Sequence, residues 1–104
     1  MKSDNLYIQQ ILDCIEKIER FTAGSNKEDF LKNEMMQSAV IMQLALIGEL
    51  SKKLSDTFKS NVDLPWKQIA GFRDRAIHDY LALDLHYVWL TIKEDLPVLK
   101  SSLK

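Results

Sequence analysis

The sequence has little of several features that mark particular classes of protein. It contains a single cysteine, Cys14, so no disulfide can form within the chain. No Cys and His residues have zinc-site spacing, and no glycine-rich phosphate loop or nucleophile-elbow motif is present. The lone thiol and the lack of an apolar signal-peptide run predict a cytoplasmic protein. The missing motifs predict that the protein uses no metal and no cofactor.

Long apolar runs and an excess of basic residues are also missing. The longest apolar stretch, Ala39–Leu50, contains Gln43 and Glu49, and it is shorter than the roughly 20 residues that a membrane span needs. The net charge is −1, whereas proteins that hold long nucleic acids by neutralising phosphates are usually far more basic. Any contact with RNA is therefore expected to be local, transient or shared between subunits.

Apolar residues at helical spacing dominate what is present. With 104 residues, 46% hydrophobic and 28% charged, the chain is predicted to form one domain, residues 1–104. The isoleucines Ile8, Ile11, Ile15 and Ile18 predict a first helix over about 4–22.

Gly24 suits the exit of this first helix. Ser25 and Glu28 have capping-box spacing, which predicts a short helix to about residue 32. A long helix is expected over 33–59, with an apolar middle covered on two sides. Gly48 in this helix predicts the close approach of another helix, from this chain or from a second subunit.

The C-terminal part begins with Pro65, which suits the first turn of a helix. A short apolar ridge follows up to Gly71, and the segment RDRAIHDY at 73–80 is expected on, or at the end of, the next helix. Asp84 is predicted to cap a final helix that Pro97 bends or ends. Four or five helices with short connections predict an all-α, up-and-down bundle.

The charged segment 73–80 holds the residues that could carry chemistry. Asp74 lies one helical turn before His78, where its carboxylate would orient the imidazole and favour the protonated form. Arg75 and Asp79 have the same spacing and are expected to pair. Arg73 precedes His78 by five residues, about 140° around an ideal helix. These two side chains converge only if the arginine reaches round, the helix ends near His78, or two copies of the segment meet in a dimer.

One arginine and one histidine suffice for metal-free RNA cleavage. The ribose 2′-hydroxyl attacks phosphorus, histidine moves a proton, and arginine stabilises the charge on the phosphoryl oxygens. The alternative is an exposed, charged turn that contains a histidine by chance. His86, Cys14, Trp66 and Trp89 are interpreted as structural or surface residues, and the Lys52–Lys53 pair as a solvated helix face.

Several short motifs in order along the chain resemble the HepT branch of the HEPN superfamily. They are IGEL-x-K-x-L at 47–54, PW-x-x-I at 65–69, Gly71, R-x-x-x-x-H-x-Y at 73–80, the Asp and apolar-Trp pair at 84–89, and Leu-Pro at 96–97. A bare R-x-x-x-x-H is a weak motif, whereas the collinear set is fairly specific.

The resemblance implies a homodimeric HEPN bundle that cleaves RNA with Arg73 and His78, supported by Asp74. It implies a toxin whose partner, a MNT-type nucleotidyltransferase antitoxin, transfers AMP onto Tyr80. The family often has Asn after the motif arginine, where this chain has Asp74. Two alternatives stay open: a non-catalytic accessory subunit that positions substrate for the nucleotidyltransferase, and Tyr80 as a packing residue.

Overall fold

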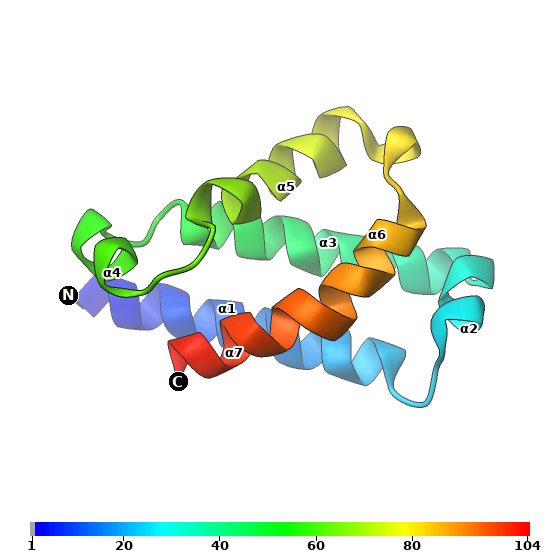
Figure 1. Cartoon of the computed structure of the whole chain (residues 1–104), viewed down its shortest axis with the longest axis horizontal. Helices are drawn as coiled ribbons and strands as arrows, with labels where there is room; N and C mark the ends of the chain where they lie inside the picture. Colours follow the sequence, from blue (N-terminus) through cyan, green and yellow to red (C-terminus); the bar gives the residue numbers. More distant parts are fainter. Residues whose placement is uncertain (1) are drawn as a thin grey trace.

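The computed structural model describes the backbone of residues 2–104 and the side chains from Asp4 onward. Every regular element in this range is helical, and the long segments α1, α3, α5 and α6–α7 run alternately in opposite directions (Figure 1). The elements are α1 (Lys2–Thr22), α2 (Lys27–Lys32), α3 (Glu34–Ser51), α4 (Asp56–Asn61), α5 (Trp66–His78), the 3-10 turn η1 (Tyr80–Ala82), α6 (Leu85–Leu90), the π-helical segment η2 (Thr91–Asp95) and α7 (Leu96–Leu103). The predicted all-α, up-and-down bundle is confirmed.

The connection between α1 and α2 follows the chemistry of its residues. Gly24 has a φ of 76°, a left-handed conformation that glycine adopts at low cost. The N-cap of α2 is Asn26 rather than Ser25. Its side chain accepts a hydrogen bond from the Asp29 N–H at 2.8 Å, and the Asp29 carboxylate accepts one from the Asn26 N–H at 3.0 Å. The capping box predicted for Ser25 and Glu28 therefore lies one residue later.

The prediction of one long helix over 33–59 is wrong, because the chain turns between α3 and α4. Ser55 is the N-cap of α4, and its hydroxyl accepts a hydrogen bond from the Phe58 N–H at 3.1 Å. The carboxylate of Asp4 on α1 accepts bonds from the Ser55 N–H at 2.8 Å and from its hydroxyl at 2.6 Å. A tertiary contact thus satisfies the backbone at the break and overrides the helical preference of the stretch.

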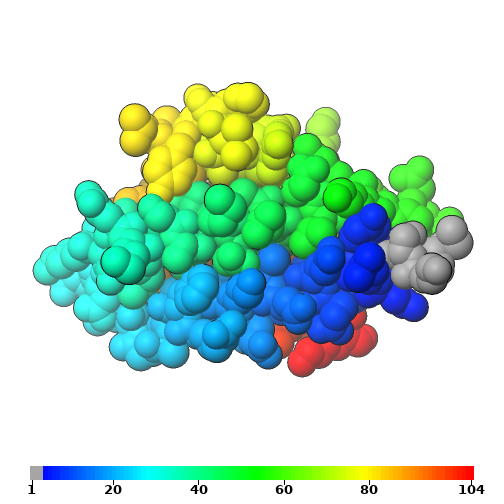
Figure 2. Space-filling view, turned by 180° about the vertical axis from the view of Figure 1, so that it is seen from behind, coloured from blue at the N-terminus to red at the C-terminus, as the bar shows by residue number. Residues whose placement is uncertain are grey.

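Helix α3 is central, with α1 on one side and α5 on the other (Figures 1 and 2). Val40 of α3 and Ile11, Ile15 and Ile18 of α1 belong to the same buried core, and each is at most 1% exposed. Toward α5, a Cβ on Gly48 would lie 2.8 Å from the carbonyl oxygen of Ile69 and 3.1 Å from the Cβ of Arg73. The close approach predicted at Gly48 is confirmed, and the approaching helix is α5 of the same chain.

The C-terminal helices correct one prediction, confirm another and narrow a third. Helix α5 continues through Gly71, so the predicted interruption there is wrong. Asp84 caps α6 as expected, its carboxylate accepting hydrogen bonds from the backbone of His86 at 3.0 Å and Tyr87 at 3.4 Å. Pro97 does not end the last helix. It lies in the first turn of α7, directly after η2, where a missing N–H is tolerated.

Apolar side chains remain on the outer surface of α3. Met35, Met42 and Leu46 are 83%, 56% and 41% exposed, on the helix that crosses the middle of Figure 2 between α1 and the α5–η1 region. None of the helices in the described range is long and apolar enough to cross a membrane. The exposed face of α3 is therefore a candidate for protein contacts.

Candidate functional site

The predicted site residues lie along the second half of α5 and in the turn that follows. Arg73, Asp74 and His78 are on α5, with His78 as its last residue, and Tyr80 begins η1. Asp79 is the C-cap of α5, and its backbone N–H donates to the Arg75 carbonyl at 2.8 Å. His78 is exposed to solvent, so its imidazole is accessible to a substrate.

Arg73 is held by two carboxylates. Its Nε lies 3.3 Å from Glu49 of α3, and its guanidinium donates to Asp74 at 3.2 Å. The contact with Glu49 is possible because Gly48 lets α5 approach α3 closely. Arg73 is 38% exposed at its side chain, and exposed ion pairs of this kind are weak. An RNA phosphate can therefore compete for this guanidinium, which the carboxylates orient in the free protein.

The expected pairing of Asp74 with His78 is wrong. The Asp74 carboxylate contacts Arg73 at 3.2 Å and Lys52, the residue after α3, at 3.6 Å. The hydrogen bond from Arg73, and next the charge of Lys52, lower the pKa of Asp74 below its usual value. Two cations attract the carboxylate more strongly than a histidine one turn away. The interpretation of Lys52 as part of a solvated helix face missed this contact.

Arg73 and His78 do not converge within one chain. Because α5 is a continuous helix up to His78, five residues place the two side chains about 140° apart around its axis. Arg73 is turned toward Glu49 rather than reaching round. The helix does end at His78, as a second route requires, and convergence through the meeting of two copies of the segment stays a prediction.

Arg75 departs from its predicted partner Asp79. Its Cζ lies 5.5 Å from the centre of the Phe72 ring and 5.9 Å from that of the Tyr87 ring on α6, within cation–π range. The sequence predicts an ion pair between this arginine and Asp79. Its position three residues before His78, on the neighbouring part of the helix surface, is the signal that points to a role near the site.

Tyr80 lies where the chain turns away from α5. Its hydroxyl is 3.0 Å from the Ser38 hydroxyl of α3, and 40% of the residue is exposed. A hollow of about 350 Å³ adjoins it, lined in part by Gln37, Ser38 and Leu81. The phenol is therefore accessible and held in place, although nothing in the sequence points to Ser38.

Comparison with known proteins shows the family of the chain. The family model "Ribonuclease HepT-like" matches residues 11–104. The chain belongs to the HepT-like ribonuclease family. It is 42% identical to the "Probable ribonuclease HepT" of Thermococcus cleftensis, over 95% of this chain and 91% of that protein. It is 37% identical to the "Putative RNase TTE0752" of Caldanaerobacter subterraneus subsp. tengcongensis, over 100% of this chain and 94% of that protein.

A third relative shows a similar sequence inside a longer protein. The chain is 36% identical over 98% of its length to the "Gamma-glutamylcyclotransferase and putative RNase MJ0434" of Methanocaldococcus jannaschii, of which it spans 46%. No solved structure matches the chain. Membership in the HepT-like family therefore rests on sequence, and the geometry of the site comes from this chain alone.

In this HepT-like chain, packing or hydrogen bonds within the bundle account for Cys14, Trp89 and Trp66. Cys14 is buried, and burial raises the pKa of its thiol. Trp89 is 7% exposed and packs 5.4 Å from the Phe30 ring. The Trp66 indole N–H donates to the carbonyls of Val62 and Lys59 at 2.9 and 3.1 Å. Within the range that the structure describes, no three His, Cys, Asp or Glu side chains group as metal ligands.

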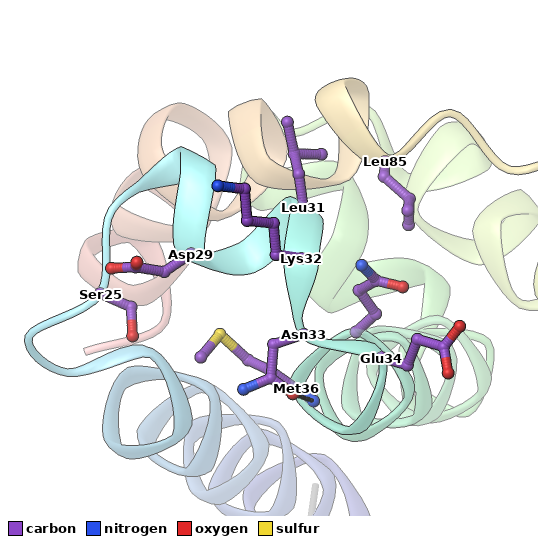
Figure 3. A pocket seen from close by; sticks show the side chains of 9 residues that line it. Ser25, Asp29, Leu31, Lys32, Asn33, Glu34, Met36 and Leu85 are labelled. Atoms are coloured by element: carbon purple, nitrogen blue, oxygen red, sulfur yellow. Dashed lines mark hydrogen bonds between the residues drawn. The ribbon is translucent and has the colours of Figure 1, made fainter.

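A larger hollow lies away from α5. Figure 3 shows this open depression of about 860 Å³, bordered by Asp29, Lys32, Asn33 and Glu34, with Leu85 of α6 nearby. None of its lining residues belongs to α5 or η1, and charges of both signs border it. It is therefore not the site to which the motif residues point.

Proposed function

We propose that this chain is a metal-independent endoribonuclease that cleaves RNA with Arg73 and His78. The ribose 2′-hydroxyl attacks the adjacent phosphorus while His78 moves a proton, and Arg73 stabilises the charge on the phosphoryl oxygens. The products are a 2′,3′-cyclic phosphate and a free 5′-hydroxyl. The observation that carries the proposal is the exposed His78 at the end of α5, in a chain of a family whose relatives are named as ribonucleases.

The proposed active unit is a homodimer. Its contact surface is the outer face of α3 with Met42 and Leu46, continued by Ile77 at 57% and Leu81 at 98% exposure. Contiguous exposed apolar surface of this kind marks association sites, and a two-fold axis would bring the two α5 motifs together. Leu46→Glu should convert a particle of about twice 12.1 kDa into a monomer in light scattering. A wild-type monomer at micromolar concentration would contradict the dimer.

The proposed biological role is that of the toxin in a type VII toxin–antitoxin pair. A MNT-type nucleotidyltransferase antitoxin would transfer AMP from ATP onto the accessible Tyr80 hydroxyl. Phosphates attached two residues from His78 would repel RNA from the site. Incubation with the cognate nucleotidyltransferase and ATP should add AMP mass to the wild type and none to Tyr80→Phe. Added mass that maps to Tyr7 or Tyr87 would contradict this assignment.

The decisive experiment is cleavage of labelled RNA by purified protein in EDTA. His78→Ala should lower the rate by about 10²–10⁴-fold, the usual contribution of a general acid–base group. His86→Ala is the matched control, since His86 is also exposed and lies on α6. Activity that disappears in EDTA and returns with magnesium would contradict the Arg–His mechanism.

The ion pairs of Arg73 favour a second candidate, a non-catalytic subunit that positions substrate for the nucleotidyltransferase. A guanidinium engaged by Glu49 and Asp74 in a chain of net charge −1 is a modest phosphate ligand. The same assay separates the two functions. The accessory subunit predicts no cleavage by either the wild type or His78→Ala.

A further inference from the structure

A further cavity, of about 250 Å³, is lined by residues of α3, α5 and the α6–η2–α7 segment, whose courses Figure 1 shows. Its apolar wall combines Leu44 and Ile47 of α3, Ile69 and Phe72 of α5, and Leu96 and Leu99 of α7. Most of these side chains belong to the core of the bundle, so the cavity is a fixed feature of the packing.

Polar side chains line this cavity together with the apolar ones. Arg75, Tyr87, Gln68 and Asp95 all line it, and the Arg75 guanidinium lies against the Phe72 and Tyr87 rings. Among residues 4–104, no carboxylate oxygen lies within 4.0 Å of Arg75. It differs in this from Arg73, which two carboxylates hold. The cavity therefore offers a flat aromatic and guanidinium surface next to an uncompensated positive charge.

The cavity is also close to the proposed catalytic histidine. Arg75 precedes His78 by three residues on the same continuous helix, a spacing that puts Cβ atoms roughly 5–6 Å apart. Both side chains are exposed. An anion bound to Arg75 would thus lie one helical turn from the imidazole.

We infer that Arg75, Tyr87 and the cavity between α5 and α6–α7 form a nucleotide-binding subsite for the RNA substrate. Arg75 binds the phosphate next to the one on which His78 acts, and the base of that nucleotide enters the cavity and stacks on Tyr87. Single-stranded RNA is bound in this way, by stacking of its bases on aromatic rings and guanidinium planes. The inference rests on the proposed ribonuclease function and adds to it the place where the base is recognised.

Asp95 sets a preference among bases. Its carboxylate repels phosphate but accepts hydrogen bonds from the amino groups of cytosine and adenine, which uracil lacks. Gln68 adds an amide that can donate or accept. The subsite should therefore bind cytosine or adenine in preference to uracil, and Asp95→Asn should reduce that preference.

Binding of short RNA to a cleavage-deficient background tests the subsite. In His78→Ala protein, fluorescence polarisation with labelled r(C)6 should show binding that Arg75→Gln or Tyr87→Leu weakens about tenfold, as loss of one stacked base does. Arg20→Gln removes the same charge from α1, far along the chain from α5, and should weaken it less than about twofold. Equal losses for Arg75→Gln and Arg20→Gln, or no binding of r(C)6, would overturn the inference.

A variant that fills the cavity provides a test independent of charge. Val98 lines the cavity and is 53% exposed, so Val98→Trp should keep the melting temperature while abolishing the preference for r(C)6 over r(U)6. Octanoate, an apolar chain with one carboxylate, represents the other kind of ligand that an apolar cavity with one arginine would bind. If octanoate binds and r(C)6 does not displace it, the cavity is not a base subsite. Unchanged RNA binding in Val98→Trp also overturns the inference, whereas cleavage by His78→Ala overturns only the proposed catalytic role.

Discussion

The part of the molecule built on α1, α2 and α6 differs sharply from the end of α5 in how it covers apolar surface. Phe30 of α2 and Val88 of α6 are 0% exposed, as are Ile11 and Ile18 of α1. At the other end, Leu81 of η1 is 98% exposed, and Ile77 and Tyr80 are 57% and 40% exposed. Stability is therefore concentrated in the first region, whereas the second leaves surface free for RNA, a second subunit or a modifying enzyme.

The charges differ in the same way. Asp4 and Ser55 close the helix break between α3 and α4 with short hydrogen bonds in a partly buried place. The charges of α5 lie in the open, in the exposed network of Arg73 with Glu49, Asp74 and Lys52. Exposed pairs contribute little to folding, so these side chains can exchange partners with a ligand at small cost.

The largest expected effect comes from removing packing in the first region. Phe30→Ala should lower the free energy of unfolding by about 3–5 kcal/mol, because the ring is fully buried against Trp89. The matched change in the second region, Leu81→Ala, should alter the stability of the monomer by less than about 0.5 kcal/mol. Urea denaturation followed by circular dichroism measures both. Because Leu81 belongs to the proposed dimer surface, a further loss in Leu81→Ala should appear only as the protein concentration rises and the dimer forms.

An intermediate effect is expected where the two regions meet. The Cβ of Gly48→Ala would lie 2.8 Å from the backbone oxygen of Ile69, so α5 must shift. Overpacking costs about 1–3 kcal/mol, against about 1 kcal/mol gained in helix propensity. A net loss of stability should accompany slower RNA cleavage, since Arg73 moves with α5.

Gly71 provides the control for this substitution. It lies inside α5, and a Cβ added there would meet nothing within 4 Å, so Gly71→Ala should stabilise the protein by up to about 1 kcal/mol. Equal responses at the two glycines would contradict the role assigned to the close approach at Gly48.

The sequence predicted local features better than tertiary ones, for physical reasons. The isoleucines of α1, the cap at Asp84 and the close approach at Gly48 follow from local spacing and local chemistry, and all three are confirmed. The break before Ser55 depends on Asp4, which is distant in the sequence, so helical periodicity could not show it. The partners of Asp74 and Arg75 are likewise set by α3 and α6.

The smallest effect, and the most specific, concerns the pH dependence of the contact between Asp4 and Ser55. The hydroxyl of Ser55, and next its backbone N–H, donate to the Asp4 carboxylate and lower the pKa of this group below its usual value of 3.8. A carboxyl whose pKa is lower in the folded state stabilises the fold above its unfolded pKa. That stabilisation is lost as the pH falls through the folded pKa. Asp4→Asn should therefore be less stable than the wild type at pH 7, and the difference should shrink below about pH 4. Urea denaturation at pH 7 and pH 3 measures the difference. Glu16→Gln, an exposed carboxylate on the same helix, controls for the change in net charge and should show no such convergence. If the difference between Asp4→Asn and the wild type were the same at both pH values, the charge of Asp4 would not be what holds the start of α4 against α1.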